Sequence, residues 1–488
     1  MYSHIFLFFS AVFFLAPVIT AQSFPQIDLG YAIHTPTFIN TTTSGTKIGL
    51  YNNIRFAQPP TGSRRFRNPV TPPPHEDGIQ DGRDRLLISD CVSAVPPQAP
   101  FPGINGTSWG HEDCLFLNVW VPEGVREGDN VPVLHWLHGS AFAFGSKDLF
   151  GDGMGVYGWV SSAHEEMDAN VGLHDGIAAL QWTKTYISRF GGDPGNIAVG
   201  GQSAGAAMIA MMLVGNGGNG TLPFQKAFLS SPALMPRRNV TERRQEVYDQ
   251  VLQAANCSSL VCLMDASQEA LAVTNKKVLN LPGGSGGGTL GPGIGIGPFP
   301  DGQYLLDAVP ILLQQGRYHK NVTAVMAGNT AAEGFGMTAD VSTYEDFATL
   351  VHRLVPGASN TTVQHIRDMY PYPDSQLQLV ANSWTTDAVF ACNARAVANA
   401  YGKRAQREGV DLPVVNVSLA RQFQSEVVKF STGKLKQENK TDDWPLYVPG
   451  ANMVNITLEG IEQSVDPWAR KPNCEIILKT ILDKRNGA

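Results

Sequence analysis

The serine at position 203 lies in the stretch GNIAVGGQSAGAAMIAMMLV, between an apolar run and a run rich in alanine and methionine. Ile197–Val199 predict a short buried strand, and Ala204–Leu213 predict a helix of good helix formers. A strand that turns directly into a helix pushes the serine hydroxyl outward and directs the first N–H groups of the helix to the same point. A developing oxyanion there meets backbone donors and the positive end of the helix dipole. Ser203 is therefore the candidate nucleophile.

The G-x-S-x-G pattern alone does not identify a nucleophile in a chain with 50 glycines. A second copy, formed by Gly283, Ser285 and Gly287, lies in LPGGSGGGTLG. No strand is predicted before this copy and no helix after it, so residues 283–297 are interpreted as a surface loop. The context of a strand before and a helix after separates Ser203 from Ser285.

Elements that could position Ser203 follow one another along the chain. The strand-like runs LNVWVP, VPVLHWL, NIAVG, AFLS and TAVMAG alternate with helical stretches. This alternation predicts an α/β fold around one mostly parallel sheet flanked by helices. We expect residues 22–488 to form a single domain, because no long linker or internal repeat interrupts them.

The first 21 residues predict a signal peptide, with the short apolar core IFLFFSAVFFLAPV before a small-residue cleavage site. No later run predicts a membrane span, so we expect a secreted, soluble, extracellular protein. Six cysteines are consistent with three disulfides in that oxidising setting. Ten N-x-S/T sequons predict a glycoprotein: Asn40, Asn105, Asn219, Asn239, Asn256, Asn321, Asn360, Asn416, Asn439 and Asn455.

The net charge of −7, with scattered Lys and Arg, argues against binding to nucleic acid. An apolar content of 43% and a charged content of 16% describe a chain that can bury a large core. No histidine–carboxylate cluster has the spacing of metal ligands, so we expect no metal and no cofactor.

Several motifs in a fixed order resemble those of one family. They are YNNIRFAQPPTGSRRFRNP, EDCLFLNVWVP, HGSAFAFGS, FGGDPGNI, GQSAG, GPFPDGQYL and GNTAAEGF. The chain resembles the type-B carboxylesterase/lipase family, the secreted cholinesterase-like branch of the α/β-hydrolase fold, and looks most like its fungal members. The resemblance covers almost the whole chain after the signal peptide.

The resemblance implies a Ser–His–Glu triad that hydrolyses carboxylic esters through an acyl-enzyme, with a small-molecule ester as the partner. Ser203 matches the nucleophile and Glu333, directly after the strand-like run TAVMAGN, matches the acid. The backbone N–H groups of Ser140, Ala141 and Ala204 match the oxyanion hole, although the family usually has glycines in this loop. A Cβ at Ser140 restricts φ and strains the turn.

The resemblance also implies side-chain partners away from the serine. The family's disulfide pairing implies Cys91–Cys114, Cys257–Cys262 and Cys392–Cys474. Arg65 and Glu112 match a buried ion pair beside the first bridge. Phe142 and Phe144 are interpreted either as lining the acyl side of the site or as plain core.

The triad histidine cannot be assigned. Its place lies well downstream of the acid, but the last of the 11 histidines is His365. His352 and His365 are expected on helices, and His319 on the surface. The segment REGVDLPVV is the one most similar to the family's histidine loop, and in it Glu408 occupies the position of the histidine. A carboxylate with an ordinary pKa of about 4.3 is a weak base for a hydroxyl proton.

Two gaps separate this chain from the family pattern. A central strand that ends in Asn-Tyr-Arg is absent where Gly155 meets Val156, and about one strand is absent between Cys392 and the REGVDLPVV segment. Loss of a central strand leaves edges that must be covered or paired again. Two functions stay open: a serine hydrolase of esters, lipophilic esters or lactones among them, and an impaired or non-catalytic member that binds ligands or proteins. The gaps are typical of a truncated splice form or gene model.

Overall fold

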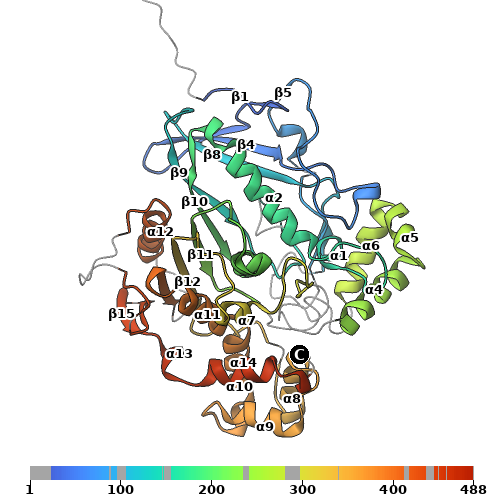
Figure 1. The fold of residues 1–488 in the computed structure, drawn as a ribbon, viewed down its shortest axis with the longest axis vertical. Coiled ribbons are helices and arrows are strands. Elements are labelled where there is room, and N and C mark those ends of the chain that lie inside the picture. The colour runs from blue at the N-terminus through green and yellow to red at the C-terminus, as the bar shows by residue number, and fades with distance from the viewer. Residues whose placement is uncertain are drawn as a thin grey trace, which may run out of the picture.

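The computed structural model describes residues 24–86, 89–95, 106–145, 147, 155–234, 241–280, 297–338, 340–410, 417–435, 444–448, 450–457 and 459–486. Its centre is a seven-stranded sheet in the order β15-β14-β13-β12-β11-β10-β9 (Figure 1). Strands β9 to β14 are parallel, and β15 is antiparallel to β14. The bounds are β9 Val131–Leu137, β10 Gly192–Gln202, β11 Lys226–Ser230, β12 Ala324–Thr330, β13 Ala405–Val410, β14 Asn452–Ile456 and β15 Ile461–Val465. The predicted α/β-hydrolase fold with a mostly parallel sheet is confirmed.

Helices cover both faces of this sheet, which explains the short apolar runs of its central strands. α3 packs on β10 and β11, and α11 on β12 and β13, while Leu419 and Phe430 of α12 pack on the opposite face against Phe228 and Met326. The helices are α1 Gly155–Trp159, α2 Val171–Tyr186, α3 Ala204–Val214, α4 Thr241–Ala255, α5 Leu260–Asp265, α6 Gln268–Leu279, α7 Val309–Gln314, α8 Tyr344–Leu354, α9 Asn360–Asp368, α10 Leu377–Thr385, α11 Cys392–Tyr401, α12 Val417–Ser431, α13 Pro467–Arg470 and α14 Asn473–Ile481. Within the described ranges, none of these helices has the length and apolarity needed to cross a membrane.

A second, three-stranded sheet in the order β3-β4-β8 lies beside the β9 end of the central sheet (Figure 1). Its strands are β3 Phe38–Thr41, β4 Lys47–Arg55 and β8 Phe116–Pro122. Two small sheets are formed by β1 Ile27–Asp28, β2 Ile33–His34 and β5 Ile79–Gln80, and by β6 Ser93–Ala94 and β7 Ser108–Trp109. β8 is thus separated from β9, although a connection of only eight residues, 123–130, joins them.

The predicted cross-links are confirmed. The three bridges are Cys91–Cys114, Cys257–Cys262 and Cys392–Cys474. Arg65 Nη2 lies 2.7 Å from Glu112 Oε2, and both side chains are buried. Arg65 Nη1 donates to the carbonyl oxygens of Leu263, Met264 and Ala266. A buried pair of this kind joins the N-terminal region to α5, so its role here is structural.

Strand β13 carries charged side chains into the middle of the sheet. Arg407 is fully buried, and its Nε lies 3.4 Å from Oδ2 of the buried Asp466. Glu408 lies opposite Gly328 of β12 and is buried, with Oε2 unpaired among the described residues. Burial raises the pKa of Glu408 from its ordinary value of 4.5 to about 8, and the nearby Arg407 acts in the opposite direction.

Substituting Glu408→Gln is expected to stabilise the protein at pH 8. Because its pKa is raised, the folded protein keeps the Glu408 proton between pH 4.5 and about 8, whereas the unfolded chain loses it. The stability associated with this proton is complete below pH 4.5 and is lost as the pH rises to about 8, by an amount on the order of a few kcal/mol. Glutamine keeps the shape and cannot ionise.

Urea unfolding of both proteins at pH 5, 6.5 and 8 checks this prediction. The free energy of unfolding of the variant is expected to fall less with pH than that of the parent. Glu462→Gln, in the edge strand β15 of the same sheet, removes an exposed carboxylate and is the matched control. Equal pH dependence in all three proteins would contradict the prediction.

Candidate active site

Ser203 occupies the turn between β10 and α3, and its backbone is strained. Its φ of 56° and ψ of −122° lie outside the regions that residues with a Cβ usually adopt. The Ser203 N–H donates to the Ser230 carbonyl at 2.9 Å, and the Ser203 carbonyl accepts from Ala207 and Ala233. These bonds tie the turn to α3 and to the end of β11. The predicted strand–turn–helix arrangement is confirmed, with both elements longer than the sequence indicated.

The two glycines of the pattern are required by close packing. A Cβ at Gly205 would lie 2.2 Å from the Leu137 carbonyl oxygen and 2.3 Å from that of His138. A Cβ at Gly201 would lie 2.8 Å from the Gly205 carbonyl carbon. Glycine therefore allows the first turn of α3 to approach the end of β9. This contact brings the loop after β9 beside Ser203.

That loop begins at His138 and contains the predicted oxyanion donors. An ideal Cβ on Gly139 would lie 3.0 Å from the Ser203 Cβ, so the loop and the nucleophile are direct neighbours. Ser140 and Ala141 have φ values of 92° and 54°, in the left-handed region that favours glycine. The strain expected at Ser140 is present and extends through Ala141 to Phe142, whose φ is 62°.

Phe142 and Phe144 belong to the core. Both are buried, and the Phe142 ring packs edge-on against Trp159 with ring centroids 4.9 Å apart. Of the two interpretations of these aromatics, the structure supports plain core.

Glu333 lies just beyond the end of β12 and is held by two donors. Its Oε1 accepts from the Ser231 hydroxyl at 2.5 Å and from the Thr330 N–H at 2.7 Å. Burial raises the pKa of the Glu333 carboxyl, and these hydrogen bonds act in the opposite direction. A Cβ on the following residue, Gly334, would lie 2.1 Å from the Asn382 carbonyl oxygen. The acid is therefore fixed against α10.

Ser231 is the site residue that sequence reasoning missed. It follows β11, has a φ of 52°, and donates its N–H to the Gly328 carbonyl at 2.8 Å. Ser231 thus connects the turn of Ser203 to Glu333, across three neighbouring parallel strands whose carboxyl ends meet at one edge. The sequence offered one signal for it: Ser231 is a polar residue directly after the strand-like run AFLS, at the end of the strand where site residues are expected.

Among the described residues, none forms a hydrogen bond with the Ser203 hydroxyl, and no histidine contacts Glu333. His352 and His365 lie on α8 and α9, as predicted. His135 is bonded through Nδ1 to the Thr183 hydroxyl at 2.9 Å. The structure places a serine beside a strained loop and an acid after a neighbouring strand, and no histidine among the residues it describes joins them.

Two expectations about this base are wrong. His319 is buried and not on the surface, with Nδ1 3.3 Å from the Gly220 carbonyl oxygen, and burial lowers its pKa. Arg407–Val410 form part of β13 instead of a catalytic loop, so Glu408 packs on Gly328 inside the sheet. Residues 411–416, the next stretch, lie outside the described residues and contain no histidine.

No group of three or more His, Cys, Asp or Glu side chains in the described part of the chain could hold a metal ion. A serine hydroxyl on a strained turn, next to left-handed backbone and a half-buried acid, suits nucleophilic attack on a carbonyl group.

Comparison with known proteins gives one family. A profile of the carboxylesterase family matches residues 38–154 and 153–407. Carboxylesterase patB of Penicillium expansum is 29% identical over 451 residues, covering 77% of this chain and 78% of that protein. Lipase 1 of Geotrichum candidum is 29% identical over 455 residues, covering 78% and 75%. The crystal structure of Aspergillus niger EstA matches with a TM-score of 0.76 at 20% identity, covering 94% of this chain and 99% of that one.

The profile match is interrupted at the first inferred gap. Its two segments meet at residues 153–154, next to the point where Gly155 joins Val156, and its second segment ends at residue 407. The first position agrees with a gap inferred from the sequence, whereas the second segment runs without a break through Cys392 to residue 407 and does not mark the second inferred gap.

Proposed function

Because this chain belongs to the carboxylesterase family, we propose that it hydrolyses carboxylic esters through an acyl-enzyme on Ser203. The observation that supports this most is the strained turn of Ser203, with φ 56° and ψ −122°, packed on the loop after β9. A strained backbone at a small polar residue persists only where the surrounding structure holds it, and such residues cluster at active sites. Glu333 is the proposed acid.

The proposed reaction begins when the Ser203 oxygen attacks the ester carbonyl carbon. The carbonyl oxygen becomes negative and is stabilised by the backbone N–H groups of Ser140, Ala141 and Ala204, the last at the positive end of α3. Collapse of this intermediate releases the alcohol and leaves the acyl group on Ser203, and water then releases the acid. The serine proton must leave and the alkoxide must gain one, and no described histidine is placed to carry it.

The proposed substrates are uncharged carboxylic esters with apolar groups, with lipophilic esters or lactones included. Relatives carry the names carboxylesterase and lipase. Phe335, two residues after Glu333 in the sequence, is 78% exposed. An exposed aromatic ring at this place suits contact with an apolar substrate.

A second function is favoured by the missing base: a member that binds an ester or a protein without turning it over. The half-buried Glu333 and the strained backbone of Ser203 fit both functions, because each could be kept by the scaffold without catalysis. The hydrolytic function requires that the Ser203 hydroxyl form a covalent bond with the substrate, and the binding function does not.

A fluorescent alkylphosphonate that reacts with nucleophilic serines tests the proposal. We expect one label per chain, slow to form, and located on Ser203 by peptide mass spectrometry. Ser231→Ala, which removes a donor to Glu333, is expected to slow labelling without moving it. A chain that remained unlabelled while folded, with its three disulfides formed, would favour the binding function.

Secretion and glycosylation are part of the same proposal. Three disulfides and relatives named secreted lipases support it. The described sequons Asn40, Asn219, Asn256 and Asn360 are exposed, while Asn321 and Asn455 are half-buried; the other four and the predicted signal peptide lie outside the described residues. Expression in a fungal host should give a protein in the medium whose mass falls after N-glycosidase treatment. Retention of the unmodified protein in the cell would contradict this.

A further inference from the structure

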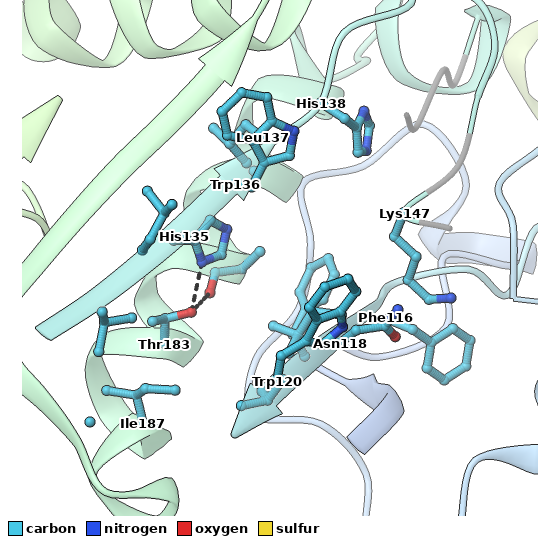
Figure 2. A pocket seen from close by; sticks show the side chains of 18 of the residues that line it. Phe116, Asn118, Trp120, His135, Trp136, Leu137, His138, Lys147, Thr183 and Ile187 are labelled. Carbon is cyan, nitrogen blue, oxygen red and sulfur yellow. Dashed lines mark hydrogen bonds between the residues drawn. The ribbon is translucent and has the colours of Figure 1, made fainter. Parts of the chain in front are cut away.

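Two strand edges face each other across a cavity of about 940 Å³. Within the described ranges, β9 pairs with β10 alone, and its other edge is the end of the central sheet. Within the same ranges, β8 pairs with β4 alone, and its other edge is likewise the end of its sheet. The cavity is lined by all seven residues of each strand, and Figure 2 shows labelled side chains of both strands around it.

The volume of this cavity matches a strand. One residue of a sheet fills roughly 160 Å³, from a rise of about 3.3 Å, a strand spacing of about 4.8 Å and a layer spacing of about 10 Å. The cavity therefore holds about six residues of extended chain. Helix α2 covers one side, where Thr183 bonds His135 of β9.

The lining favours a peptide over other occupants. Trp120 of β8 and Leu134 and Trp136 of β9 are 66%, 43% and 49% exposed, so large apolar surface is uncovered. A fatty acyl chain would cover these side chains but would leave the edge N–H and carbonyl groups without partners. A second folded copy brings a whole sheet, which does not fit between two strands. An isolated strand satisfies both the backbone edges and the apolar side chains.

We propose that the space between β8 and β9 is an acceptor site for one extended, uncharged apolar peptide segment, which pairs as a β-strand with the open edge of β9. The interruption of the family match at residues 153–154, between β9 and β10 in the chain, agrees with a strand missing here. The proposal does not depend on the esterase function, because the site is defined by backbone edges and not by Ser203.

The probe is a capped peptide that copies residues 323–329, TAVMAGN, with a lysine at each end. This segment contains most of β12, a central strand of the same sheet. Binding to the full-length, disulfide-bonded protein is followed by tryptophan emission, calorimetry and thermal unfolding. We expect a 1:1 complex, a blue shift as Trp120 and Trp136 become covered, and a higher Tm.

The matched control is the same peptide with proline in place of its methionine. Proline removes a ladder N–H and is expected to weaken binding by about tenfold or more. On the protein side, Leu134→Lys and Trp120→Lys place a charge on each wall at exposed positions, and each is expected to weaken binding about tenfold while cooperative unfolding persists.

Three results would overturn the proposal. One is no binding of the strand peptide, or equal binding of the proline control. Another is displacement of the peptide by palmitate, together with lysine variants that lose palmitate binding as much as peptide binding. This result would make the cavity an acyl-chain site. The third is a dimer in sedimentation that dissociates in Leu134→Lys, which would make the edge a self-association surface.

Discussion

Replacing Ser203 by alanine is expected to reduce hydrolysis of a chromogenic ester by at least about 100-fold, to near the rate without protein. The acyl-enzyme forms at the Ser203 oxygen, and no other hydroxyl in the described structure combines a φ of 56° at the start of a helix with a neighbouring oxyanion loop. The fold should survive, because the hydroxyl makes no hydrogen bond with a described residue and the backbone bonds to Ser230, Ala207 and Ala233 remain.

Ser285→Ala is the matched control, since Ser285 lies in the other G-x-S-x-G sequence. Residues 283–287 lie outside the described residues, and the sequence around them lacks a strand and a helix. Initial rates with a nitrophenyl ester, corrected for hydrolysis without protein, give the comparison. If both variants lost activity equally, or if neither did, Ser203 would not be the nucleophile.

The nucleophile turn could be predicted because its determinants are local. Three apolar residues, a small polar turn and a run of helix formers occur within 20 residues, and each element formed where its composition indicated. Glu333 was found in a similar way, at the end of the apolar run that became β12. Parallel strands bring such ends together, so the juxtaposition follows from the fold class.

The environment of the site depends on contacts that periodicity does not contain. Ser231 reaches Glu333 from another strand, 102 residues earlier in the chain. His319 is buried because the chain around α7 folds against the end of α3, where its N–H donates to Leu213. Arg407 and Glu408 suggested a loop, yet β12 and β14 pair with both sides of this segment. Tertiary pairing overrode local polarity there.

The open edge of β9 also bears on the active site. β9 leads directly into His138 and the loop that packs on Ser203, so whatever orders β9 also orders the oxyanion donors. Among the described strands β9 is an edge strand with Leu134 and Trp136 exposed, whereas a central strand is paired on both sides. Loss of a base and an open edge beside the loop would both lower catalysis, through different steps.

The missing base gives the second large effect. We expect the chain to hydrolyse esters about 10²–10⁴-fold more slowly than a complete family member, because that is the usual contribution of general acid–base catalysis. Added imidazole should restore part of this loss, because it can take the Ser203 proton and return it to the leaving group near pH 7. The measurement is the initial rate against imidazole concentration at constant ionic strength.

Three proteins make this measurement decisive. Ser203→Ala should show no increase above the background reaction of imidazole itself, which separates rescue of the enzyme from simple catalysis in solution. His352→Ala and His365→Ala should behave like the parent, because these side chains lie on α8 and α9 and not beside Glu333. The contrary result has three parts: the parent is as fast as a longer form with a restored histidine loop, imidazole does not change its rate, and one of these histidine variants is inactive. That result would show that a relocated histidine serves as the base. Rescue that saturates, requires Ser203 and spares both histidines would instead place the deficit at the proton transfer, with the nucleophile and the oxyanion loop intact.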